Sequence, residues 1–159
     1  MNDLSRRCII QVIITAIFGG LPVAAGDSTQ NAIRVALSGY DPVAYFTDGH
    51  PVKGSSAFSF QLDDVVYYFA SAEHRKMLAS DPDRYTPHFS GYCTLGVSLG
   101  MKLEADPEAW AIADGKLYVF GNKQSRVVYD NDPAGTISRA EANWATVKNQ
   151  KLEVEKVGN

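Results

Sequence analysis

Alternating and continuous apolar segments predict a strand hairpin in the first half of the chain. Apolar and polar residues alternate over residues 58–62, which is the pattern of a strand with one buried face. Residues 65–70 are almost continuously apolar and rich in Val and Tyr, as a central strand is. Asp63–Asp64 fits the turn between them. A shorter apolar and aromatic segment, Val43–Phe46, is also predicted to be a strand.

A second hairpin is predicted over residues 111–120. Two apolar runs there flank Asp114–Gly115, and Asp-Gly is a turn pair that tolerates positive φ. Helical spacing and capping residues predict four helices, near residues 72–80, 93–99, 123–129 and 137–148. Ser71 is expected to cap the first of these. Ser138–Glu141 is expected to form a capping box at the start of the last.

Together these elements predict an α+β fold, in which a small antiparallel sheet built from the hairpins carries several short helices packed on it. A length of 159 residues favours a single domain. We expect that domain to span residues 36–147, between a flexible lead-in, residues 26–35, and a frayed charged tail, residues 148–159. The sequence shows no evident internal repeat.

The first 25 residues have the layout of a cleavable secretory signal. Two arginines precede an apolar stretch over residues 8–18, and small residues follow at 23–25. The alternative is an uncleaved membrane anchor, but Gln11 and Pro22 interrupt the roughly 20 apolar residues that an anchor needs. We therefore expect a secreted or periplasmic protein with no stable membrane span after cleavage.

Charge and motif content exclude several function classes. The chain has 15 Lys and Arg against 18 Asp and Glu, for a formal net charge of -3. No basic excess is present to neutralise phosphates, so no nucleic-acid partner is expected. The sequence also lacks a Gly-rich phosphate loop, an HExxH motif and a GxSxG motif. Whether the protein is an enzyme therefore stays open.

Three segments together resemble the YHS domain family. They are Tyr40–Phe46, Val66–Arg75 and Asp81–Tyr85, and their order and spacing carry the resemblance. Further similarity at Gly91–Cys93 and Asp106–Trp110 extends it to exported, stand-alone YHS domain-containing proteins, over about residues 36–145.

The resemblance implies the fold more strongly than it implies a metal site. Metal-handling members of the family carry three cysteines, two of them one helical turn apart, which suits a soft metal ion. This chain has Ala44, Ala70 and His74 at those positions. One imidazole does not complete a tetrahedral site, which needs four ligands.

Cys93, His74 and His88 are the candidate site residues. Cys93 is the one cysteine after residue 25, so it has no partner for an internal disulfide. Thiolate and imidazole are ligands for copper or zinc, and Met101 would add a further soft ligand. The alternatives are a hydrogen-bonded core histidine for His74, a surface histidine for His88 and a small buried apolar residue for Cys93.

These residues support hypotheses of different classes. The first is an exported binding module that holds a copper or zinc ion, or a small ligand, through Cys93 with His74 or His88. The second is a thiol enzyme or redox protein in which one of these histidines serves as the base. Lys102 alone supplies positive charge near the cysteine in sequence, which argues weakly against a reactive thiol. The third is a structural domain with a decayed metal site.

Overall fold

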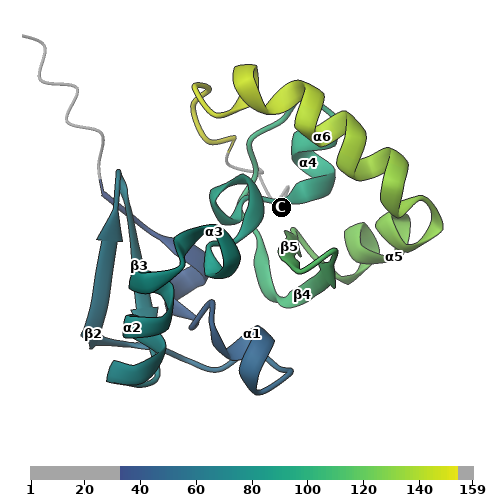
Figure 1. Cartoon of the computed structure of the whole chain (residues 1–159). Helices are drawn as coiled ribbons and strands as arrows, with labels where there is room; N and C mark the ends of the chain where they lie inside the picture. The colour runs from purple at the N-terminus through teal and green to yellow at the C-terminus, as the bar shows by residue number, and fades with distance from the viewer. Residues whose placement is uncertain (1–32, 154–159) are drawn as a thin grey trace, which may run out of the picture. The chain divides into compact units, whose positions relative to one another are not determined.

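The computed structural model describes residues 33–153, and two groups of elements follow one another along the chain (Figure 1). After β1 (Arg34–Val35), the first group consists of η1 (Ala36–Gly39), α1 (Ala44–Thr47), β2 (Ser55–Leu62), β3 (Val65–Phe69), α2 (Ala72–Ser80) and α3 (Pro82–Tyr85). The second group consists of η2 (His88–Gly91), α4 (Thr94–Ser98), β4 (Asp106–Ala113), β5 (Lys116–Phe120), α5 (Lys123–Asn131) and α6 (Pro133–Val147). The predicted signal peptide, residues 1–25, lies outside the described residues.

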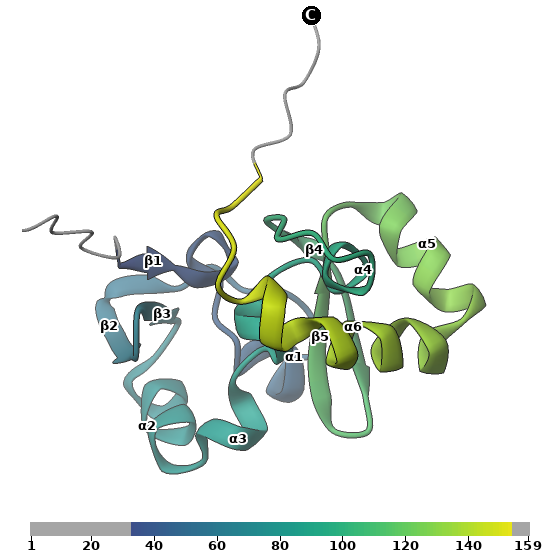
Figure 2. The ribbon, with the colours of Figure 1, turned by 90° about the horizontal axis from the view of Figure 1, so that it is seen from above.

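The α+β class is confirmed, but the hairpins form two sheets instead of one. β2 pairs antiparallel with β3, and β1 joins the other edge of β3 in parallel, so the end of the predicted lead-in is part of a sheet. β4 and β5 form a separate antiparallel pair. Seen from above, α2 lies beside the first sheet, while α5 and α6 lie beside the second (Figure 2). No helix within residues 33–153 has the length and apolar character that crossing a membrane requires.

Two predictions of local structure are wrong, and in both cases an aspartate side chain accepts from backbone amides at the start of a helix. Val43–Phe46 was predicted to be extended, but it lies at the start of α1, where the Asp41 carboxylate accepts hydrogen bonds from two backbone amides. α6 begins at Pro133, ahead of the predicted capping box at Ser138–Glu141. The Asp132 side chain caps it, and proline suits the first position because that amide has no helical partner.

The two groups of elements repeat one structural unit. Each unit runs through a short turn of 3-10 helix, a short helix, a hairpin and two further helices. The turns have nearly the same backbone: φ is 52°, 50° and 81° in Leu37–Gly39, and 52°, 54° and 76° in Phe89–Gly91. A tyrosine follows each turn, Tyr40 and Tyr92. The first repeat is thus residues 36–85, and the second is residues 88–147.

The helices after each hairpin match as well. α2 and α5 each have nine residues, and their caps, Ser71 and Asn122, lie two residues after the last strand residue. Both helices end before an Asp-Pro pair whose aspartate, Asp81 or Asp132, caps the next helix. The expectation of no internal repeat is therefore wrong. The repeats share turn and cap residues, and these are too few to produce an evident sequence repeat.

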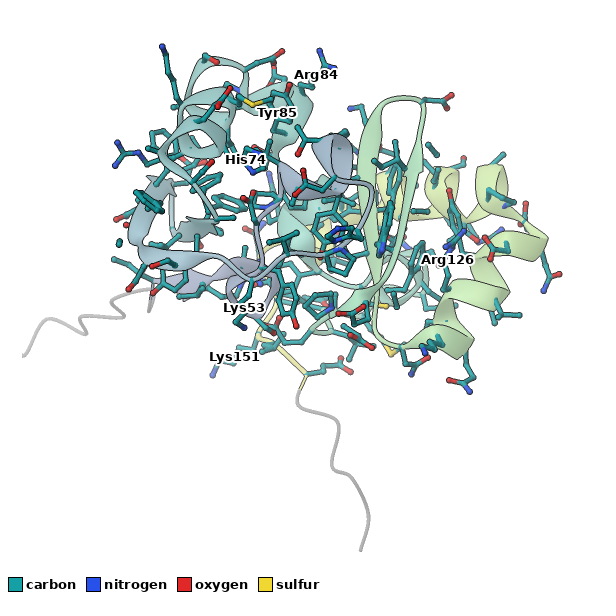
Figure 3. The ribbon with its side chains drawn as sticks, turned by 90° about the horizontal axis from the view of Figure 1, so that it is seen from below. Lys53, His74, Arg84, Tyr85, Arg126 and Lys151 are labelled. Atoms are coloured by element: carbon teal, nitrogen blue, oxygen red, sulfur yellow. The ribbon has the colours of Figure 1, made fainter. Side chains whose placement is uncertain are left out.

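Equivalent positions supply the core of each repeat. Phe69 and Phe120 end the second strand of each hairpin and are both fully buried. Leu78 and Tyr129 are the buried residues of α2 and α5. On its other side, α5 is tied to β4 by Arg126 (labelled in Figure 3), which donates to the carbonyl of Trp110. Each repeat therefore packs its own helix against its own hairpin.

A few side chains join the repeats. The Tyr45 hydroxyl donates to the carbonyl of Pro107 at 2.9 Å, and its ring packs edge-on against Trp110. Arg34 stacks over the Tyr92 ring and donates to the carbonyl of Ser90. These contacts bury aromatic surface and satisfy polar groups between the repeats, so we expect the described part of the chain to unfold as one unit.

We predict that stability falls above about pH 10 because buried tyrosines must stay protonated. Burial raises the pKa of Tyr67 from 10.0 to about 12. Between these values the unfolded chain loses a proton that the folded chain keeps, so unfolding is favoured by up to about 1.4 kcal/mol per pH unit. The Y67F variant should show a shallower loss of stability between about pH 10 and about pH 12 in urea titrations. An equally steep loss in that variant would contradict this assignment.

The repeat also predicts which glycine tolerates a methyl group. A Cβ at Gly54 would lie 2.5 Å from the backbone carbon of Tyr68, whereas one at Gly121 would lie 3.5 Å from the Cys93 sulfur, an ordinary contact. Gly121 also corresponds to Ala70 in the first repeat. G54A should lower the free energy of unfolding by about 2 kcal/mol or more, and G121A by less than about 1 kcal/mol. Equal losses in chemical denaturation would contradict the correspondence.

Candidate functional site

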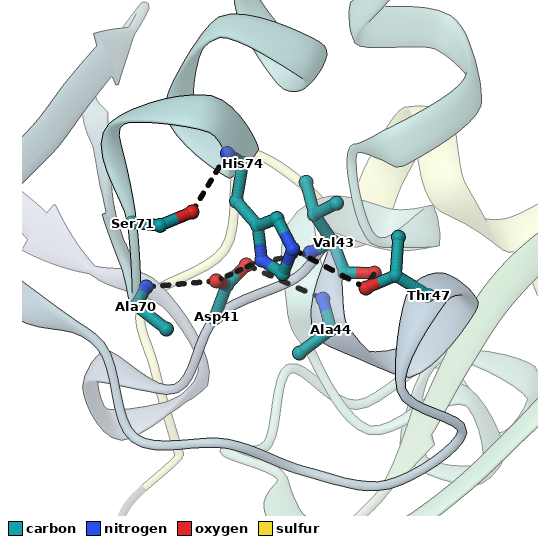
Figure 4. A network of polar contacts seen from close by, with 7 residues as sticks. All are labelled: Asp41, Val43, Ala44, Thr47, Ala70, Ser71 and His74. Carbon is teal, nitrogen blue, oxygen red and sulfur yellow. Dashed lines mark hydrogen bonds and ion pairs between the residues drawn. The ribbon is translucent and has the colours of Figure 1, made fainter.

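In the first repeat, the carboxylate of Asp41 joins three parts of the chain (Figure 4). Asp41 is fully buried. It accepts hydrogen bonds from the amides of Val43 (2.8 Å) and Ala44 (3.4 Å) at the start of α1, and from the amide of Ala70 (2.8 Å) just after β3. It also contacts Nδ1 of His74 on α2 at 2.7 Å. A single acceptor thus links a turn, a strand end and two helices.

His74 is the hydrogen-bonded histidine that was one of the alternatives for this residue. Its Nδ1–H is the donor to the Asp41 carboxylate, because a carboxylate oxygen can only accept. Its Nε2 lies 3.4 Å from the Thr47 hydroxyl, which itself donates to the Val43 carbonyl. The backbone amide of His74 donates a hydrogen bond to the hydroxyl of Ser71, the cap residue of α2. The ring therefore fills the space between α2 and Asp41.

In the second repeat, Cys93 takes the place of Asp41. Its side chain is buried, with 1% exposure, and it is the cap residue of α4. The sulfur accepts hydrogen bonds from the amides of Gly96 at 3.3 Å and Gly121 at 3.0 Å. These glycines correspond to Ala44 and Ala70. The thiol therefore makes the same two kinds of link, to a helix start and to a strand end, that the carboxylate makes.

The counterpart of His74 is Ser125, and here the repeats differ most. Asn122 accepts from the Ser125 amide at 2.8 Å, as Ser71 does from His74. Serine has no ring to fill the space beside the sulfur, and a cavity of about 510 Å³ lies there. Its lining includes Cys93, Gly121, Asn122 and Ser125, together with Ser38, Leu103, Glu104, Ala105, Asp106, Pro107, Leu152 and Glu153.

The lining of this cavity, which we call the Cys93 cavity, is acidic. Among the residues that the structure describes, it includes three carboxylates and no basic side chain. Glu104 is paired with Arg34 at 3.4 Å, and the Asp106 carboxylate accepts from the Glu108 amide at 2.9 Å. Glu153 follows the last helix and bonds through its amide to the Lys102 carbonyl. The cavity therefore carries net negative charge beside a sulfur atom.

His88 lies in a different setting from the other two candidates. Its Nε2 is 2.6 Å from a Glu141 carboxylate oxygen, and its ring meets Phe89 and Tyr118 edge-on. It thus ties η2 to α6.

Cys93, His74 and His88 therefore make three separate sets of contacts. Within residues 33–153, no group of three or more His, Cys, Asp or Glu side chains is placed to hold a metal ion. Neither imidazole is a hydrogen-bond partner of the sulfur among the contacts of the described residues. Copper or zinc binding stays a prediction, and the described residues supply no set of ligands for it. The thiol enzyme stays a hypothesis, and neither histidine is placed by these contacts to act as the base for Cys93.

Sequence reasoning identified Cys93 and His74 but missed Asp41 and Ser125. The signal that connects them was visible, because Ser-Gly-Tyr precedes both Asp41 and Cys93. Aligning the chain on these tripeptides pairs the aspartate with the cysteine. Aligning it on the two Asp-Pro pairs that follow α2 and α5 pairs His74 with Ser125.

No protein-family model, curated protein or solved structure matches this chain. The resemblance to the YHS domain therefore stays a prediction, and the site is interpreted from its own geometry.

We predict that D41N destabilises the protein strongly. The amide of asparagine keeps one acceptor oxygen but turns its NH₂ toward a backbone donor, so at least one buried amide loses its partner. The expected loss in free energy of unfolding is about 2 to 4 kcal/mol in urea titrations. D48N removes the same charge at an exposed position after α1 and should change stability by less than about 0.5 kcal/mol. Similar losses in both variants would contradict the role of Asp41.

Proposed function

We propose that this protein is a small-ligand-binding module whose site is the Cys93 cavity. The observation that carries the proposal is the difference between His74 and Ser125. In the first repeat an imidazole occupies the space beside the buried acceptor, whereas the second repeat keeps the acceptor and its two amide donors but leaves that space open.

The size and position of the cavity support this proposal. A volume of about 510 Å³ falls in the range of about 300 to 1,000 Å³ that is typical of small-molecule sites. The lining draws on both repeats, with Ser38 from the first and Cys93 from the second. Cavities at the junction of two structural units are common ligand sites because neither unit alone has to fill them.

A small molecule is favoured over a bare metal ion. The sulfur is already held by two amides, and no described group of three ligating side chains accompanies it. A metal ion here would have to take its remaining ligands from solvent or from a bound molecule. The secretory layout of residues 1–25 supports an exported location for this module, where it would meet extracellular or periplasmic solutes.

The cavity can be tested by filling it. S125H places an imidazole where His74 lies in the first repeat, whereas S125A leaves the space open. Small methanethiosulfonate reagents react with a thiolate to form a mixed disulfide and release methanesulfinate. We expect S125H to slow the modification of Cys93 by about tenfold or more, since the ring covers the sulfur, and S125A to react like the wild type. C93S measures any modification at Cys8.

Ligand binding itself is measured through the NMR signals of the two backbone amides that donate to the Cys93 sulfur. A fragment library balanced in charge is added to the isotope-labelled protein, and the amide resonances of Gly96 and Gly121 are followed by NMR. We expect at least one fragment to shift both resonances at millimolar concentration, and S125H to abolish the shifts. If no fragment does so, and S125H and S125A react with the thiol reagent at equal rates, the proposed site is wrong.

A further inference from the structure

The first repeat shows what shape of ligand the second repeat can hold. In the first repeat, a flat imidazole ring lies between the start of a helix and a buried acceptor, 2.7 Å from it. The second repeat reproduces the helix cap, the acceptor position and both amide donors. Apart from the exchange of the acceptor itself, Asp41 for Cys93, two differences lie beside it: Ser125 lacks the ring, and Gly121 lacks a Cβ, which would lie 3.5 Å from the sulfur. Both differences enlarge the space that a ring would occupy.

The charges around the cavity favour one sign of charge on the ligand. Glu104, Asp106 and Glu153 line it, and Arg34 compensates the first of these from outside the lining. The N-terminus of α5 also faces this region through Asn122, and a helix N-terminus carries about half a positive charge. Asp106 and Glu153 take part in no ion pair among the described residues. Their two negative charges outweigh that half charge together with the Lys53 ammonium, which donates to the carbonyl of Ser38 in the lining, so the cavity attracts cations.

The apolar part of the lining matches the flat face of a ring. Leu103, Ala105, Pro107 and Leu152 contribute to the same cavity as the carboxylates. A ring can pack on such groups while its charged nitrogen reaches the acidic rim.

From shape, charge and lining together, we infer that the Cys93 cavity takes a small, flat, cationic nitrogen compound of the imidazole class, with its ring in the position that His74 fills in the first repeat. This inference rests on the proposed function and specifies the ligand class of the same site.

Two probes with one ring and opposite charges test the inference. Histamine carries an ammonium group on imidazole, and imidazole-4-acetate carries a carboxylate. Both are titrated into the full chain at neutral pH, and the Gly96 and Gly121 amide resonances are followed by NMR. Histamine is expected to bind at least about tenfold more tightly, as two favourable carboxylate contacts imply. S125H should abolish binding of histamine.

Charge variants then locate the origin of the preference. The double variant D106N/E153Q should reduce the preference for histamine by about fivefold or more, in line with weak, partly exposed ion pairs. E108Q removes a neighbouring exposed carboxylate that is outside the lining and should leave the preference unchanged. A preference that survives D106N/E153Q would overturn the charge argument.

The remaining outcomes separate this inference from the function on which it rests. If imidazole-4-acetate binds as well as histamine and S125H blocks both, the ligand class is wrong while the cavity remains a binding site. If neither probe binds but zinc alone shifts the two amides, a metal site replaces the inference. If nothing shifts them and S125H leaves thiol modification unchanged, the proposed function fails as well.

Discussion

A buried acceptor that ties a helix start to a strand end is the interaction on which this fold depends. Asp41 does this in the first repeat and Cys93 in the second. Each is separated by one tyrosine from a turn with three successive residues at positive φ. Leaving such amides without an acceptor would cost about 1 to 3 kcal/mol each, so a suitable acceptor is needed at this point in either repeat.

The proposed function rests on how the two repeats differ around this shared interaction. The first repeat has a charged acceptor, and a histidine ring completes its hydrogen bonds and seals the space beside it. The second has a less polar acceptor, which tolerates burial with two amide bonds alone, and a serine at the ring position. The two repeats have the same order of elements, and a few positions decide whether the space beside the acceptor is filled by a ring or forms part of a cavity.

Much of the secondary structure was predictable because its signals are local. Both hairpins and the caps of α2 and α5 depend on turn and capping residues that lie within a few positions of the elements they define. Val43–Phe46 was misassigned because its helix depends on Asp41, whose acceptor role becomes visible only when its partners at Ala70 and His74 are known. The Ser138–Glu141 motif was misread because a stronger cap, an aspartate followed by proline, precedes it.

The sequence by itself determined the α+β class, the two hairpins and the presence of one cysteine, Cys93, with histidines near it in the chain after residue 25. Only the tertiary structure decided that the Cys93 thiol and the two imidazoles make separate sets of contacts. Their hydrogen-bond partners lie about 30 residues away or more in sequence, so these contacts depend on how strands and helices pack. It also decided that the chain is a structural duplication. A repeat carried by a turn conformation, two caps and one buried acceptor leaves too few shared residues to be evident until the backbones are compared.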